Sequence, residues 1–123
     1  MITPGIDHIA LTVPDLDRQV DRLTRTFGMA IESRTDDFAV IADTSTGLKL
    51  ELGRSSDGEI HVRHIGFRAD DLDSAHEQLV DAGMETARAP HRRDDTRMYT
   101  SFLTQPGVIE VQLVNYDDDQ RRA

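Results

Sequence analysis

The 123-residue sequence contains no cysteine and no tryptophan, and aromatic residues make up only 5% of it. Without cysteine, neither disulfide bonds nor thiolate chemistry can contribute. No apolar run approaches the roughly 18 to 20 residues needed to cross a bilayer. The opening MITPGIDHIALTV lacks the basic leader, apolar stretch and small-residue cleavage site of a signal peptide. These absences lead us to expect a cytoplasmic protein.

Basic residues are also scarce, with 14 Lys and Arg against 23 Asp and Glu, and the formal net charge is −9. Nucleic acids and anionic membranes are bound by clustered basic side chains, so we expect neither as a partner. The acidic surface favours solubility, and it would also attract a cationic ligand. The shortage of aromatic residues argues against a site that sandwiches a planar drug.

An internal repeat organises the sequence. The string IDHIAL at residues 6–11 returns as VRHIGF at 62–67, and DLD at 15–17 returns as DLD at 71–73. Such self-similarity predicts two copies of one structural unit. At this length we expect a single domain over residues 1–123, with modules at about 6–54 and about 61–115 and a tail at 116–123.

Each module is predicted to have the order βαβββ. Apolar and polar residues alternate over residues 6–13, which indicates a strand. Asp15 is a favourable helix N-cap, an apolar stripe follows it, and Gly28 ends the helix. Asp71 and Gly83 occupy the same positions in the second module. The pattern predicts an α+β fold whose further strands lie at about 29–34, 38–44, 48–54, 84–90, 97–104 and 108–115.

The alternation also predicts which side chains share the face of the strands that points away from the helices. Four separate strands contribute His8, Glu51, His64 and either Glu110 or Gln112. Imidazole and carboxylate ligands suit Zn²⁺, Fe²⁺, Mn²⁺, Co²⁺ or Ni²⁺ better than Ca²⁺. A single histidine in a strand is usually structural, and a repeat can keep two after metal binding is lost. Because the two histidines occupy equivalent positions of the repeat, we favour a metal site.

The motifs of both modules resemble those of one known superfamily. The strings IDHIALTVPDLD and VRHIGFRADDLD open the modules, and GLKLELG and QPGVIEVQLV close them. Together they resemble the vicinal oxygen chelate superfamily, which includes glyoxalase I, methylmalonyl-CoA epimerase, extradiol dioxygenases and bleomycin-binding proteins. The resemblance covers residues 6 to about 115 and is nearest to the glyoxalase I and epimerase branch. It implies an eight-stranded, U-shaped sheet around a cavity, with the helices on the outer face and usually a homodimer.

The resemblance also implies a set of metal ligands, namely His8, Glu51, His64 and one residue of the final strand. The family's usual ending places a glutamate six residues after a proline, and this count from Pro106 reaches Gln112. In the family's ending, Asp-Pro-x-Gly, the glutamate lies four residues after the glycine, so counting from Gly107 with a one-residue deletion reaches Glu110 instead. We take Gln112 as the fourth ligand and keep Glu110 as a catalytic base.

The activity that the resemblance implies is that of a lyase or isomerase of the glyoxalase or epimerase kind. A divalent Zn, Ni, Co, Mn or Fe ion would chelate two adjacent oxygens of a small substrate and stabilise an enediolate. Glu110 or Glu51 would move the proton next to the carbonyl. The alternative is a metal-free binding protein that sequesters an antibiotic or a metabolite. An extradiol dioxygenase is the third interpretation, although most such enzymes are longer.

Two further features have weaker interpretations. Residues 91–97, HRRDDTR, either anchor a carboxylate, phosphate or thioester cofactor or form a solvated connection whose aspartates neutralise its arginines. We favour the solvated connection. His76 falls beside the apolar stripe of the second predicted helix, and we expect it at the boundary or surface rather than in a metal site.

Overall fold

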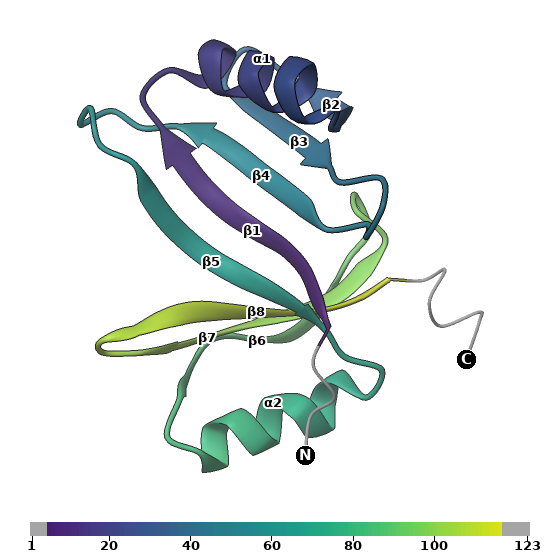
Figure 1. Ribbon diagram of the computed structural model, residues 1–123. Helices are drawn as coiled ribbons and strands as arrows, with labels where there is room; N and C mark the ends of the chain where they lie inside the picture. The colour runs from purple at the N-terminus through teal and green to yellow at the C-terminus, as the bar shows by residue number, and fades with distance from the viewer. Residues whose placement is uncertain (1–4, 117–123) are drawn as a thin grey trace. The chain divides into compact units, whose positions relative to one another are not determined.

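The computed structural model describes residues 5–116, which form eight strands and two helices (Figure 1). The α+β class and the two βαβββ modules predicted from the sequence are confirmed. Neither helix of the described residues has the length and apolar character of a membrane-spanning segment. The elements are β1 (Ile6–Val13), α1 (Leu16–Phe27), β2 (Ala30–Arg34), β3 (Phe38–Ala42), β4 (Lys49–Arg54), β5 (His61–Arg68), α2 (Leu72–Asp81), β6 (Glu85–Arg93), β7 (Met98–Gln105) and β8 (Val108–Tyr116).

Most elements differ from the predicted limits by one to three residues, and two of these differences affect the interpretation. Strand β6 extends to Arg93, so the segment 91–97 begins inside a strand. Tyr116, which we assigned to the tail, is instead the last residue of β8, because β7 offers it Met98 as a ladder partner. The rest of the predicted tail lies outside the described residues.

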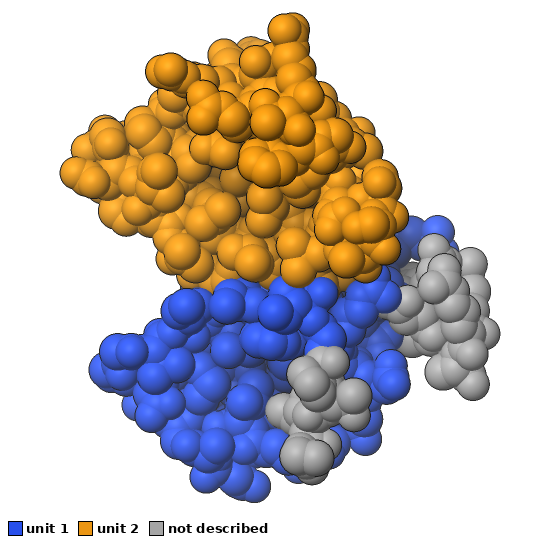
Figure 2. Space-filling view, in the orientation of Figure 1, with its two compact units in different colours: residues 1–6, 65–123 blue, residues 7–64 orange. Residues whose placement is uncertain are grey.

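The chain divides into two compact units (Figure 2). Unit 2 comprises Asp7–His64, and the described part of unit 1 comprises residues 5–6 and 65–116. The strand order in unit 2 is β2-β3-β4-β1, with β1 parallel to β4 and β3 antiparallel to both of its neighbours. The strand order in unit 1 is β5-β8-β7-β6, with β5 parallel to β8 and the other pairs antiparallel. The expectation of one domain over residues 1–123 stays a prediction.

Both helices begin where the sequence predicts. The Asp15 carboxylate accepts a hydrogen bond from the backbone N–H of Arg18 at 3.1 Å, which satisfies one of the unpaired donors of the first turn of α1. Asp71 does the same for Ser74 at the start of α2, also at 3.1 Å. Helix α1 ends at Gly28, whose φ of 69° is the left-handed conformation that glycine adopts without strain.

Each helix covers one face of the strands of its own unit. In unit 2, Leu16 and Val20 of α1 pack with Ala39, Ile41 and Leu52 of the strands. In unit 1, Leu72 and Ala75 of α2 pack in the same way with Met84, Leu103 and Leu113. Because side chains alternate along a strand, the residues between these apolar positions point to the face that the helix does not cover.

The core of unit 2 gives a test of this packing. Ile41 is completely buried, whereas Ile31 on the neighbouring strand is 49% exposed. We predict that Ile41→Ala lowers the free energy of unfolding by about 2 to 5 kcal/mol, through lost burial and the cavity that remains. The control variant Ile31→Ala should lose much less. Urea unfolding measures both, and equal losses would contradict this description of the core.

Candidate metal centre

Three side chains of unit 2, each from a different strand, meet on the face opposite α1. His8 lies in β1, Glu51 in β4 and His64 in β5. Strand β1 pairs with β4 so that Ala10 lies beside Glu51. Because Ala10 is two residues after His8, the side chains of His8 and Glu51 point to the same face of the strands. One ligand atom from each of the three residues lies within 4.8 Å of the others. The structure therefore brings together three of the residues that the sequence predicted as metal ligands.

The distances between these atoms suit a single ion. The Nε2 atoms of His8 and His64 are 3.1 Å apart, and His8 Nε2 is 3.7 Å from Glu51 Oε2. Atoms that each lie about 2.0 to 2.2 Å from one ion are separated by about 2.8 to 3.6 Å in tetrahedral or octahedral coordination. The two nitrogens fall inside this range, and Glu51 needs only a small shift of its carboxylate. The donor set, two imidazoles and a carboxylate, is one that first-row divalent metals prefer.

The three side chains differ in their access to solvent. The His8 side chain is 2% exposed, whereas that of Glu51 is 28% exposed and His64 is half-buried. A small molecule can therefore approach the cluster from the side of Glu51 and His64, while His8 forms its buried wall.

Asp7 fixes the buried histidine. Its side chain is fully buried, and His8 Nδ1–H donates a hydrogen bond of 2.8 Å to Asp7 Oδ2. A carboxylate accepts hydrogen bonds, so the ring proton stays on Nδ1 and the lone pair of Nε2 faces Glu51 and His64. Carboxylates that orient a ligating imidazole in this way are a general feature of metal sites.

The sequence analysis missed Asp7, although the sequence carries a signal for it. Asp7 stands in the row of β1 that continues with Ile9, Leu11 and Val13, all of them apolar. A charged side chain in such a row is costly to bury without a partner, so its presence indicates a specific hydrogen bond.

The two candidates on the final strand lie in unit 1. Gln112 is buried, and its place in β8 is regular, opposite Gly66 of β5 and Phe102 of β7. Glu110 is half-buried and lies where the register between β7 and β8 shifts by one residue. Because the other three candidate ligands belong to unit 2, the roles of Gln112 and Glu110 stay predictions.

The Gln112 amide has a defined orientation within unit 1. Thr100 Oγ1 donates to the backbone oxygen of Leu113 at 2.6 Å, so this hydroxyl offers a lone pair to its other neighbour. That neighbour is Gln112 Nε2, which donates to it at 3.0 Å. The nitrogen end of the amide is therefore the end held by Thr100.

The basic segment 91–97 pairs with its own aspartates. Arg92 lies 3.3 Å from Asp94, and Arg93 hydrogen bonds to Asp95 at 2.9 Å. The hydrogen bond from Arg93 holds the pKa of Asp95 below its ordinary value. These contacts agree with a solvated connection in which the aspartates neutralise the arginines.

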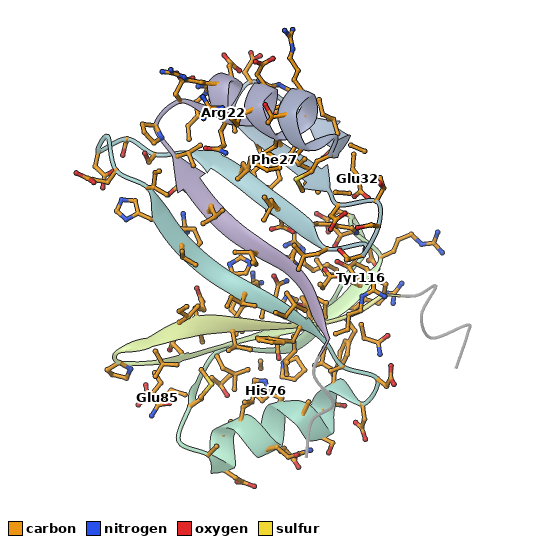
Figure 3. All side chains as sticks on the ribbon, viewed as in Figure 1. Arg22, Phe27, Glu32, His76, Glu85 and Tyr116 are labelled. Atoms are coloured by element: carbon orange, nitrogen blue, oxygen red, sulfur yellow. The ribbon has the colours of Figure 1, made fainter. Side chains whose placement is uncertain are left out.

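The expected boundary or surface position of His76 is wrong. The residue is buried on α2, on the side of the helix that faces the strands (Figure 3). Its Nδ1 and Nε2 atoms each lie 2.8 Å from a hydroxyl oxygen, that of Ser101 and that of Thr86 respectively. A buried histidine is tolerated here because both ring nitrogens have hydrogen-bond partners, which the helical stripe alone did not reveal.

The contact between Asp7 and His8 predicts an effect on metal affinity. Asp7→Asn keeps the size of the side chain but removes the charge that orients the imidazole, and we expect metal to bind about 10 to 100 times more weakly. The control is Asp57→Asn, because Asp57 also holds a histidine, the exposed His61 at 2.6 Å. Competition with a chromogenic chelator measures both variants. Equal affinities for Asp7→Asn and the parent would show that this carboxylate does not support a ligand.

Several solved structures that resemble the chain are methylmalonyl-CoA epimerases. A variant of the Streptomyces coelicolor enzyme in complex with 2-nitronate-propionyl-CoA is 21% identical, with a TM-score of 0.71, and the match covers 95% of this chain and 99% of that one. The epimerase from Mycobacterium tuberculosis is 20% identical, with a TM-score of 0.71 and coverage of 97% and 92%. An epimerase in complex with methylmalonyl-CoA and NH4+ is 24% identical, with a TM-score of 0.71 and coverage of 95% and 96%. At these identities the likeness establishes the fold.

The family is established by a sequence model. No curated protein matches the chain. The model of the Glyoxalase/Bleomycin resistance protein/Dioxygenase superfamily matches residues 5–112, which includes His8, Glu51, His64 and Gln112. The resemblance that we drew from the motifs of the two modules is thereby confirmed. The chain belongs to the Glyoxalase/Bleomycin resistance protein/Dioxygenase superfamily.

Proposed function

We propose that the protein is a metal-dependent isomerase of the epimerase kind, which moves a proton next to a carbonyl group of a small substrate with two neighbouring oxygens. The observation that carries the proposal is the cluster of His8, Glu51 and His64, whose ligand atoms lie within 4.8 Å of one another. The epimerases among the similar structures support it, and one of them holds methylmalonyl-CoA. A CoA thioester of a small dicarboxylic acid is therefore the first substrate to test.

His8, Glu51 and His64 would hold the ion, with Gln112 as the fourth protein ligand. A carboxamide binds metal through its oxygen, and the contact between Gln112 Nε2 and Thr100 supports this because it engages the nitrogen end. A divalent ion at this centre supplies Lewis acidity, which polarises the two substrate oxygens and favours the negative charge that develops on them.

Glu110 is the proposed base. Its carboxylate would move the proton to or from the carbon next to the carbonyl, a role that typically contributes about 10² to 10⁴ in rate. If Glu51 does not bind the metal ion, it is the alternative base. We also propose a homodimer, because the edge strands of an open sheet need protection and two-fold dimers are the commonest oligomers. A cytoplasmic location remains part of the proposal.

An extradiol dioxygenase is the second candidate. Two histidines and one carboxylate are the ligand set of many non-haem iron oxygenases, and His8, His64 and Glu51 supply that set without a fourth ligand. The two proposals differ at Gln112, which ligates in the isomerase and is dispensable for the metal in the dioxygenase.

Single substitutions distinguish the roles of the proposed site residues. We predict that His8→Ala and His64→Ala lose the metal, and that Gln112→Ala lowers the metal content. Glu110→Ala should keep the metal but slow the exchange of the substrate's acidic C–H proton with D2O by about 10² to 10⁴. Elemental analysis and NMR with methylmalonyl-CoA measure the two effects.

His61→Ala is the matched control, because His61 lies in the same strand as His64 but pairs with Asp57 at the surface. Full metal retention in all the variants would refute the metal centre, whereas a parent that takes up no first-row divalent metal would favour the metal-free binding protein. Retention in Gln112→Ala alone, together with O2 consumption in the presence of catechol and Fe²⁺, would favour the dioxygenase.

A further inference from the structure

A pocket of about 330 Å³ in unit 2 adjoins the candidate metal centre. Two of the three clustered side chains, Glu51 and His64, line it. Ala10 and Thr12 of β1, Phe38 at the start of β3 and Gly53 near the end of β4 also line it. A molecule whose oxygens contact the metal ligands would therefore extend into this pocket.

Strand register explains why these residues face the same way as the metal ligands. Thr12 lies beside Gly53 in the parallel pair of β1 and β4, and Phe38 lies opposite Gly53 in the antiparallel pair of β3 and β4. Thr12 is four residues after His8, and Gly53 is two residues after Glu51, so all of them fall on the face away from α1. The pocket and the metal centre thus share one surface of the sheet.

The floor of the pocket is made of small side chains. Ala10, Thr12 and Gly53 leave the backbone of two adjacent strands close to the surface, and Phe38, which is 42% exposed, adds an apolar wall. The charged residues Asp37, Arg54 and Arg63 also line the pocket, and Arg54 Nε donates a hydrogen bond to the backbone oxygen of Asp36 at 2.8 Å. The part of the pocket formed by Ala10, Thr12, Gly53 and Phe38 suits an apolar substituent better than a charged one.

The fold does not need glycine at position 53. A Cβ built on Gly53 has Thr12 Cγ2 as its nearest neighbour at 3.5 Å, which is an ordinary van der Waals contact, and the backbone is not in the left-handed region. A side chain at this position would therefore occupy the pocket without straining the strand. Space for a ligand, rather than backbone conformation, accounts for the glycine.

We infer that Gly53 is a specificity-determining residue, and that the substrate carries an apolar substituent which lies over Ala10, Thr12 and Gly53 beside its two metal-binding oxygens. This inference rests on the proposed metal centre and goes beyond it by naming the part of the substrate that the pocket recognises. Filling the floor of the pocket restricts the size of that substituent and leaves the metal ligands in place.

Hydroxamates of two sizes test the inference, because they chelate metals through two adjacent oxygens. Acetohydroxamate carries a methyl group and benzohydroxamate carries a ring, and calorimetry on the Co²⁺-loaded protein measures their affinities. The parent should bind both. Gly53→Val should bind acetohydroxamate as the parent does and benzohydroxamate about tenfold or more weakly, since even one methylene group in a well-filled pocket changes selectivity by this order. The control is Ser33→Val, an exposed strand position outside the pocket, which should bind both probes like the parent.

The outcomes separate the inference from the proposed function. If the metal-loaded parent binds neither hydroxamate, the metal centre is not open to a chelating substrate, and both proposals fall. If the parent binds both and Gly53→Val weakens both equally or neither, the metal centre stands and the role of Gly53 is overturned. Should Gly53→Val fail to fold or to take up Co²⁺, Gly53→Ala decides between the same two results, because its Cβ has room.

Discussion

The parallel pairing of β1 with β4 is the constraint on which both the core and the candidate site of unit 2 depend. One register places Leu11 beside Leu52 and Ala10 beside Glu51. The first pair faces α1 and joins the hydrophobic core, while the second pair faces the other way. A shift of one residue would turn apolar side chains to the open face and bury the carboxylate under the helix. The burial of Leu52 and Ile41 therefore also holds the metal ligands in position.

The contact between Asp7 and His8 places a carboxylate in the interior, where burial of a charge is costly. A fully buried carboxylate loses its hydration, and the hydrogen bond to the His8 imidazole contributes to offsetting that loss. Such an arrangement is expected where a precisely held nitrogen matters more than stability. It gives His8 one tautomer and one direction, whereas the more exposed Glu51 retains freedom to adjust to a ligand.

Local signals in the sequence were sufficient for the elements and for three of the site residues. Asp15, Gly28 and Asp71 act through hydrogen bonds or backbone conformations within a few residues, so their roles can be read directly. The repeat placed His8 and His64 at equivalent positions, and alternation put Glu51 on the matching face.

Other features required strand register, which the sequence pattern does not contain. Gly53 becomes part of a pocket only because β4 lies between Thr12 of β1 and Phe38 of β3. His76 could be buried because Ser101 and Thr86, on two strands that follow α2, give both of its ring nitrogens a hydrogen-bond partner. Asp7 was the exception, since its apolar neighbours in β1 already indicated that it needed a partner.

The central claim is that one divalent ion is bound by two imidazoles and a carboxylate in unit 2. X-ray absorption spectroscopy at the zinc edge, on protein loaded with one equivalent of Zn²⁺, tests it most directly. We predict a first shell of nitrogen and oxygen atoms at about 2.0 to 2.2 Å, with the outer-shell scattering of two imidazole rings. A first shell of oxygens alone, or scattering from fewer than two rings, would contradict the assignment of His8 and His64 as ligands.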